Sequence, residues 1–352
     1  MNEADRKLIF DELNTRTIKY RGDAFVKKVG SIIIGLILLI GLVGCGQLKK
    51  ESATEEKETG TTNEENIYLT FKDDTDAEVV LKEKPERIAV LSSDSLAMLY
   101  DLGGQAVGRL TSSSQIPEKA KDVPELGTAN EINVEELVAL KPDLVIGTPT
   151  FHAKLAEVLE SNGIPLALLK TASFEDVKEK AKLLGEIIGT EEKAEQLLQE
   201  TESKMNEITA KIPADEEKTV MILNVTPSSI SIQKENTTAL EIAELLGLNN
   251  IAEELDASPK SPSTAPYSME KMVEKQPDFI FMTIHGAEGA GLKKIETDLK
   301  ENPAWASLNA VKNNQAIVLP SQLFLVNPGF HYYESMNTMA SIVYPELFKN
   351  EN

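Results

Sequence analysis

The 352-residue chain has very few residues of the kinds that usually carry catalysis or metal binding. It contains one cysteine, Cys45, and three histidines, His152, His285 and His331. So few histidines leave little room for a His-rich cage around zinc or manganese. The sequence also lacks a Gly-x-Ser-x-Gly elbow, a His-Glu-x-x-His motif and a P-loop. We therefore expect the protein not to be an enzyme.

Basic residues are also scarce relative to acidic ones. The chain has 36 Lys and Arg against 57 Asp and Glu, for a formal net charge of -21. Residues 1–44 carry a net +2, so the remainder carries about -23. Binding of nucleic acid depends on Lys and Arg that neutralise phosphates. The charge balance therefore excludes a nucleic-acid partner.

Only one long apolar run is present, from Val29 to Val43, and its 15 residues fall short of the ~20 that span a bilayer. Lys27-Lys28 precedes the run and small residues follow it, which is the pattern of a secretory signal. The tetrapeptide Leu42–Cys45 resembles the lipobox of bacterial lipoproteins. That resemblance implies that Cys45 is lipidated and begins the mature protein. A transmembrane anchor with an incidental cysteine is the alternative.

Residues 1–25 are charged, of mixed sign and without pattern, which does not suit the start of a signal. We expect translation to start near residue 26, with a long cytoplasmic n-region as the alternative. Residues 1–45 are then the signal with its lipobox. Residues 46–66 are rich in Glu, Lys, Thr and Ser and cannot bury enough apolar area to fold, so they are predicted to be a disordered tether.

The rest of the chain alternates short apolar runs with helical segments. After two expected strands at 68–71 and 78–81, near-continuous apolar strands alternate with helices up to residue 169, which implies a parallel sheet covered on both faces. Helices at 174–188 and 191–212 interrupt this pattern, and it restarts at residue 219.

A phrase repeated in the two halves indicates an internal duplication. In Leu137–Ile146 and in Met272–Phe281, the end of a predicted helix is followed by Lys-Pro-Asp or Gln-Pro-Asp and then by a predicted strand. We predict an α/β fold of two similar Rossmann-like lobes joined by a single long helix. The expected bounds are 67–173 for the N-terminal lobe, 174–213 for the connecting helices and 214–352 for the C-terminal lobe.

Ligands of parallel α/β sheets meet the loops that leave the carboxyl ends of the strands. In this chain those loops are rich in hydroxyl groups, with scattered aromatic residues, and they lie at 92–94, 111–114, 148–152, 226–229, 284–286 and 321–324. Such a composition suits a ligand with polar edges and an apolar body.

The order of these motifs resembles the periplasmic-binding-protein family that serves iron–siderophore, haem and cobalamin importers. The resemblance spans about residues 83–348 and rests on short signatures at 124–127, 142–143, 277–278, 302–305 and 311–314. It implies a class III binding-protein fold with a ligand site between the lobes. It also implies a monomeric lipoprotein on the outer face of the cell membrane of a Gram-positive bacterium. The expected partners are an ABC permease and its ATPase.

In the second half, the strand that follows Pro-Asp leads directly to His285 and then to a glycine. This order is similar to that of haem-binding lipoproteins of Gram-positive haem-uptake systems. This resemblance implies that haem is the transported ligand and that His285 is an axial ligand of its iron. The family's second ligand is a Met near the start of the first helix, where Met98 lies, although alignment places Ala97 opposite it. Further candidate contacts with the ligand are Ser93, Thr150, Arg109 and Tyr332.

Several alternatives remain open at the candidate site. A ferric siderophore, usually anionic, would need cations such as Arg109 or Lys234, and cobalamin belongs to the same family. His285 could instead be an ordinary loop histidine, and Met98 could pack in the core. The glycine-rich segment 286–291 lacks the spacing of a dinucleotide fingerprint and is expected to be a mobile loop.

Two acidic residues occupy matching places in the predicted lobes. Glu135 and Glu270 each lie on the helix that precedes a Pro-Asp strand. The family resemblance implies that one such glutamate per lobe pairs with an arginine of the permease. The alternative is that both are ordinary solvated carboxylates.

Overall fold

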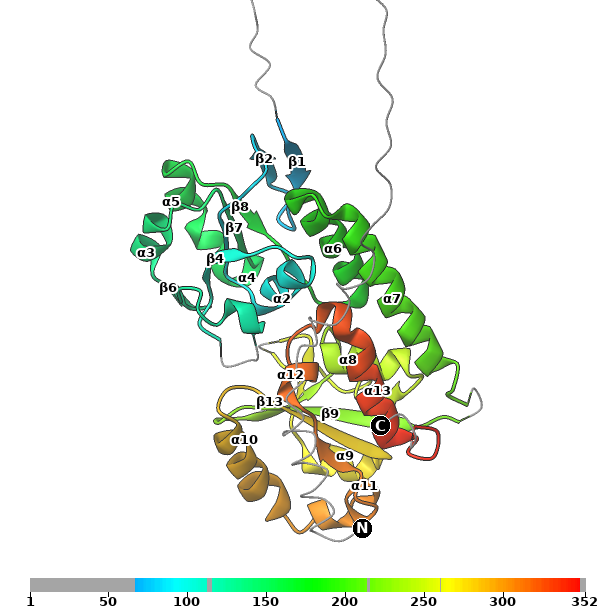
Figure 1. Ribbon diagram of the computed structural model, residues 1–352. Helices are drawn as coiled ribbons and strands as arrows, with labels where there is room; N and C mark the ends of the chain where they lie inside the picture. The colour runs from blue at the N-terminus through cyan, green and yellow to red at the C-terminus, as the bar shows by residue number, and fades with distance from the viewer. Residues whose placement is uncertain (1–66, 113–115, 214–215, 260, 349–352) are drawn as a thin grey trace, which may run out of the picture. The chain divides into compact units, whose positions relative to one another are not determined.

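The computed structural model describes residues 67–112, 116–213, 216–259 and 261–348 (Figure 1). The predicted signal, the predicted lipidation site Cys45 and the predicted tether lie outside these residues. Within the described ranges, no helix combines the length and apolar character that a membrane span requires.

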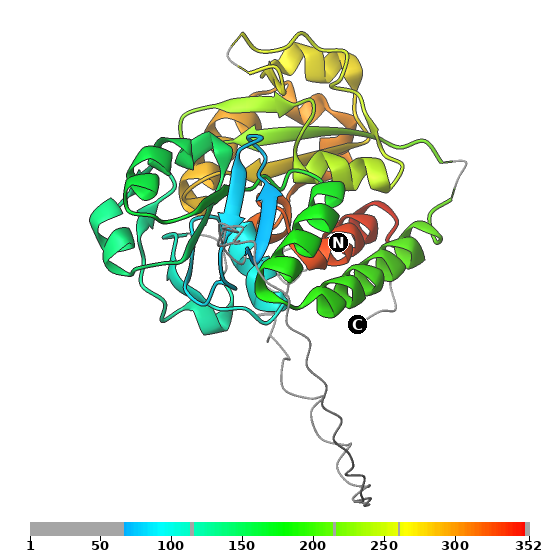
Figure 2. The same cartoon turned by 90° about the horizontal axis from the view of Figure 1, so that it is seen from above.

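A β-hairpin begins the described chain, formed by β1 (Leu69–Lys72) and β2 (Glu78–Leu81) as predicted. Its turn closes the edge of the neighbouring sheet. Asp73 and Asp74 accept the backbone N–H groups of Leu168 (3.0 Å) and Lys170 (2.6 Å) on and after strand β8. The hairpin lies beside helix α6 (Figure 2), to which the Tyr68 hydroxyl donates a hydrogen bond. It therefore shields a strand edge that could otherwise pair with another chain.

The first sheet contains four parallel strands in the order β4-β3-β7-β8. Alternate residues of one strand enter different cores: Val90 of β3 belongs to the largest apolar cluster and Ala89 to a separate one. Both faces of the sheet are therefore covered, as predicted for near-continuous apolar strands. Strands β5 (Gly127–Thr128) and β6 (Glu131–Ile132) pair with each other in a separate antiparallel sheet. The other elements of this part of the chain are β3 (Ile88–Val90), α2 (Ser93–Asp101), β4 (Ala106–Arg109), α3 (Val134–Ala139), β7 (Leu144–Gly147), α4 (Pro149–His152), α5 (Ala156–Ser161) and β8 (Leu166–Leu168).

The second sheet is mixed, in the order β12-β10-β9-β13-β14, with β11 also pairing with β9. Strands β10 and β12 run antiparallel, which the simple strand–helix alternation does not predict. After β9 the chain turns back at once, because Thr226 N–H bonds to the Ser229 carbonyl (2.9 Å) and closes a tight hairpin. The elements are β9 (Thr219–Val225), β10 (Ile230–Gln233), α8 (Thr238–Leu245), β11 (Asn249–Asn250), β12 (Thr264–Pro266), α9 (Met269–Lys275), β13 (Phe279–Ile284), α10 (Glu288–Ile295), α11 (Asn309–Lys312), β14 (Ala316–Val318) and α12 (Ser321–Phe324).

The repeated Pro-Asp phrase has the same local structure in both halves. The residue before each proline, Lys141 or Gln276, has a positive φ (48° and 45°), and the proline cannot continue the helix. The Asp143 carboxylate then accepts the N–H of Arg87 just before β3 (2.9 Å), and Asp278 accepts that of Thr219 at the start of β9 (2.9 Å). Each aspartate thus fixes the start of the neighbouring strand.

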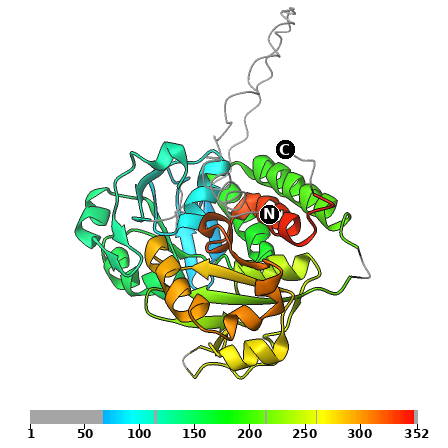
Figure 3. The ribbon, with the colours of Figure 1, turned by 90° about the horizontal axis from the view of Figure 1, so that it is seen from below.

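Helices α6 (Phe174–Ile188) and α7 (Glu191–Thr209) follow the first sheet. A capping box at Ser173 begins α6, and Gly189, with φ 64°, ends it. Helix α7 ends at Thr209, about three residues before the predicted end. The last helix, α13 (Tyr332–Val343), packs against α7 (Figures 1 and 3). The largest apolar cluster includes residues of both sheets and of these helices.

The expectation of a mobile glycine-rich loop at 286–291 is wrong for most of its length. Gly286, with φ 88°, makes a turn, and α10 begins at Glu288. A Cβ on Gly291 would lie 2.2 Å from Ile284 Cγ2, so glycine permits the helix to pack directly on β13. The glycines here serve a close helix–sheet contact.

Candidate functional site

Hydroxyl groups gather at the carboxyl edge of the first sheet, as the loop sequences predict. Ser93, in the first turn of α2, donates to Ser112, which follows β4, with an Oγ–Oγ distance of 3.1 Å. Thr150 is exposed in α4, which follows β7. Because β4, β3 and β7 are neighbours, these three loops lie along one edge of the sheet. Thr150 is therefore available to polar groups of a ligand, and the Ser93 oxygen can still accept a hydrogen bond.

His285 occupies the corresponding edge of the second sheet. Its backbone N–H bonds to the Val225 carbonyl (2.8 Å) and extends the pairing of β13 with β9 by one residue. The side chain is reached by solvent and, among the described residues, its imidazole has no hydrogen-bond partner. Partial burial by the surrounding protein lowers the pKa of His285 below 6.5. A neutral imidazole with a free ring nitrogen is the form that coordinates iron.

Two predicted ligand contacts lie in the core instead. Met98 is 0% exposed, and a Cβ at Gly329 would lie 3.0 Å from its Cγ, so its side chain packs tightly against the turn at Gly329. Tyr332 is also 0% exposed, and its hydroxyl donates to Glu241. Burial, together with the Glu241 carboxylate, raises the pKa of Tyr332, which opposes a tyrosinate ligand. The structure thus places both residues in the core, which favours core packing, the alternative stated for Met98.

The two predicted cations, Arg109 and Lys234, form hydrogen bonds within the protein. Arg109 is 5% exposed and donates to the carbonyls of Ala120 (2.9 Å), Leu110 (3.1 Å) and Lys121 (3.2 Å) and to the Glu125 carboxylate (2.8 Å). Four of its five donors are therefore used within the protein. Lys234 donates to the carbonyl of Leu255. Arg109 is thus buried, and its donors serve contacts within the protein.

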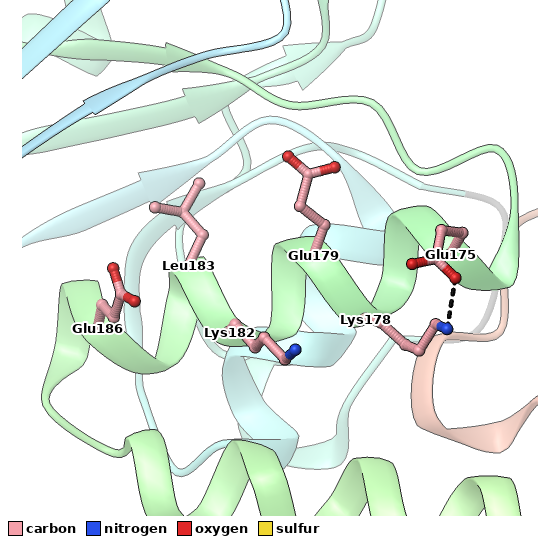
Figure 4. Close-up of a pocket in the computed structure, with 6 residues that line it drawn as sticks. All are labelled: Glu175, Lys178, Glu179, Lys182, Leu183 and Glu186. Atoms are coloured by element: carbon pink, nitrogen blue, oxygen red, sulfur yellow. Dashed lines mark ion pairs between the residues drawn. The ribbon is translucent and has the colours of Figure 1, made fainter.

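The described residues contain no cluster of three or more His, Cys, Asp or Glu that could hold a metal ion. One shallow depression lies on a single face of α6 and is lined by residues of that helix alone. Figure 4 shows its lining residues, Glu175, Lys178, Glu179, Lys182, Leu183 and Glu186. Lys178 forms an ion pair with Glu175 across this face, and the surroundings are charged. This depression does not suit an apolar ligand.

Glu135 and Glu270 have the same position in their respective helices. Each is the second residue of its helix, after a capping residue, Asn133 or Ser268, whose side chain accepts a backbone N–H. Both carboxylates are exposed, and neither forms an ion pair within the part of the chain that the structure describes. A carboxylate in the first turn is favoured by the helix dipole. The two glutamates are therefore free for an external cation.

An ion cluster that the sequence did not predict links α2 to the last helix. His331 Nε2 lies 3.4 Å from Asp101 Oδ2, at the end of α2, and its Nδ1 lies 3.0 Å from Glu334 Oε1 in α13. Burial acts to lower the pKa of His331, but the hydrogen bonds and charges of Asp101 and Glu334 raise it to about 10. Other charged or titratable groups at the cluster are Tyr333 of α13 and Lys204 and Glu200 of α7.

This cluster predicts a loss of stability at alkaline pH. The folded pKa of His331 exceeds its unfolded value of about 6.5, so its contribution is complete below pH 6.5 and is lost as pH rises towards 10. Because the side chain is 34% exposed, we expect only about 1 kcal/mol. The measurement is urea unfolding of the wild type and His331→Asn between pH 6 and 10. The two free energies should converge with rising pH, and a constant difference contradicts the role of the ion cluster.

Comparison with known proteins identifies the class. A family model described as periplasmic binding protein matches residues 88–323, more than half of the chain, and the chain belongs to that family. Its members are substrate-binding proteins of ABC transporters and not enzymes. The predicted α/β fold class, the family resemblance and the absence of an enzymatic role are thereby confirmed.

The chain is similar to an uncharacterised ABC transporter substrate-binding lipoprotein of Bacillus subtilis, YvrC, with 26% identity over 332 residues. The alignment covers 92% of this chain and 99% of that protein. Two S. aureus structures are also similar, each with a TM-score of 0.64. IsdE complexed with heme is 22% identical, covering 73% of this chain and 98% of its own. SirA complexed with staphyloferrin B is 25% identical, covering 79% and 98%. The two TM-scores are the same, although one structure contains heme and the other staphyloferrin B.

Proposed function

We propose that this protein is a lipid-anchored, extracytoplasmic binding protein that delivers an iron complex to an ABC importer. We propose haem as that iron complex. The lipid would be attached at Cys45, and the partners would be a permease and its ATPase. The name of the B. subtilis relative, a substrate-binding lipoprotein that aligns with 92% of this chain, supports the anchor and the transporter.

The observation that carries haem as the ligand is the state of His285. This imidazole is reached by solvent, has no hydrogen-bond partner among the described residues and has a pKa below 6.5. It also stands at the carboxyl end of β13, the edge where α/β folds bind ligands. A neutral imidazole in such a place can coordinate a haem iron. The chain's own residues would hold the haem through this nitrogen and through the hydroxyl groups of Ser93 and Thr150.

A ferric siderophore is the second candidate, because the similar SirA structure contains staphyloferrin B. An anionic iron complex would need cations at the site. Arg109 and Lys234, the two cations named as candidates from the sequence, are engaged with backbone carbonyls. The engagement of these two cations therefore favours haem.

We further propose that Glu135 and Glu270 contact the permease. Their equivalent positions, exposure and freedom from ion pairs in the described residues support one docking carboxylate in each half. Exposed ion pairs contribute only ~0–1 kcal/mol each, so they would orient the complex more than hold it.

The direct test of the proposed ligand is a titration with hemin. The chain from residue 51 onward is titrated with hemin, and the absorption spectrum is recorded at each step. In a second experiment, binding of a panel of ferric catecholates and hydroxamates is measured. A saturable Soret shift at one equivalent supports haem. Binding of a panel member without any Soret shift would replace haem by the siderophore.

A further inference from the structure

Phe151 is the one phenylalanine in the described ranges whose side chain is exposed, at 42%. Among exposed aromatic residues in those ranges the other is Tyr68, whose hydroxyl is bonded to Glu186. A single exposed apolar residue is ordinary on a protein surface. The position of Phe151 is not ordinary, because it lies in α4, directly after the carboxyl end of β7.

The turn around Phe151 holds the ring outward. The next residue, His152, is 0% exposed and takes the buried position. Its Nδ1 accepts the backbone N–H of Thr148 (3.0 Å). A Cβ at Gly147 would lie 2.9 Å from His152 Cβ, so glycine is needed for the histidine to fit. Pro149 fixes φ at the first position of the helix. With His152 locked inward, Phe151 is held at the surface.

The surroundings of this ring match a flat ligand with polar edges. Strands β7, β3 and β4 are neighbours, so the loop of Phe151 lies along the same sheet edge as Ser93 and Ser112. Thr150, which precedes Phe151 in the sequence, is also exposed and carries a hydroxyl group. An aromatic surface flanked by hydroxyl groups offers stacking to a ring system and hydrogen bonds to its polar substituents.

We propose that Phe151 stacks on the porphyrin ring of the transported ligand and determines affinity for the ring itself, independently of the iron. This inference rests on the proposed function, since it takes haem as the ligand. It assigns separate tasks to the two sheet edges: His285 of the second sheet coordinates the metal, and Phe151 of the first sheet binds the macrocycle. The orientation of Phe151 before binding reduces the entropy lost when the ring is contacted.

The test uses hemin and metal-free protoporphyrin IX, which has the same ring but cannot take an axial ligand. We expect Phe151→Ala to weaken the binding of both probes about tenfold, the size of a lost aromatic contact. Phe151→Tyr should bind within about twofold of the wild type. His285→Ala should weaken hemin and leave protoporphyrin IX unchanged. The matched control is Leu347→Ala, which removes an equally exposed apolar side chain (40%) beyond α13 and should change neither affinity.

The outcomes separate the two proposals. If the wild type shows no saturable hemin binding, the proposed haem function fails, and this inference fails with it. If the wild type binds hemin and Phe151→Ala retains wild-type affinity for both probes, the inference alone is overturned. Because Phe151 is exposed, its variants should keep the melting temperature of the wild type, so a change in affinity reports the contact.

Discussion

Replacing His285 by alanine is expected to lower the affinity for hemin about 100-fold, which corresponds to about 2.7 kcal/mol. The variant should also lose the Soret position of an imidazole-ligated haem. The physical reason is the loss of the coordinate bond, while apolar contact with the porphyrin remains and keeps residual binding. The side chain is exposed and makes no hydrogen bond among the described residues, so its removal should leave folding intact. Absorption titration and circular dichroism of the same samples measure both effects.

Two controls make the His285 result specific. Added imidazole should occupy the vacant coordination position of His285→Ala and restore the ligated spectrum, which a purely structural defect would not allow. Met98→Leu should leave the spectrum unchanged, because Met98 is buried in the core and the substitution conserves volume, at a cost below about 1.5 kcal/mol. An unchanged Soret band in His285→Ala would exclude axial ligation by this residue.

Reversing the two docking charges is expected to lower the stimulation of the importer's ATPase without affecting ligand binding. In the double variant Glu135→Lys/Glu270→Lys, each proposed attraction to a permease cation becomes a repulsion at matching positions of α3 and α9. Since both carboxylates are exposed and unpaired in the described structure, stability should change by less than about 0.5 kcal/mol. The assay is stimulation of the importer's ATPase in proteoliposomes, together with a hemin titration of the same protein.

The matched control reverses two exposed glutamates that have no proposed role. Glu157 lies in α5, and Glu301 follows the π-helical turn after α10. Glu157→Lys/Glu301→Lys changes the net charge by the same amount, so a general electrostatic effect would appear equally in both double variants. Full ATPase stimulation by Glu135→Lys/Glu270→Lys would remove these residues from the docking surface.

Much of the fold could be read from local sequence because its determinants are local. Continuous apolar runs predicted the parallel strands of the first sheet, and the Pro-Asp repeats predicted two similar halves. The antiparallel strands β10 and β12 were missed, because they depend on a four-residue turn at 226–229 whose polar side chains look like any loop. The lobe boundaries at 173/174 and 213/214 stay predictions.

The candidate site was less accessible to sequence reasoning, since it depends on which way each side chain points. Met98 and Tyr332 have suitable chemistry but face the core, and Arg109 donates to three carbonyls that its position in the sequence does not reveal. The sequence around Phe151 gave one usable signal, an aromatic residue in a Gly-Thr-Pro turn after a strand. Its significance required knowledge that His152 takes the buried position.

By itself the sequence determined the class of protein, the restriction to binding rather than catalysis, the α/β architecture and the candidate lipid anchor at Cys45. Composition, periodicity and motif order suffice for these, because they concern segments that act over a few neighbouring residues. Tertiary structure decided which candidates can meet a ligand. It leaves His285 and Thr150 exposed and buries Met98, Arg109 and Tyr332, because exposure follows from packing between elements that are far apart in the chain.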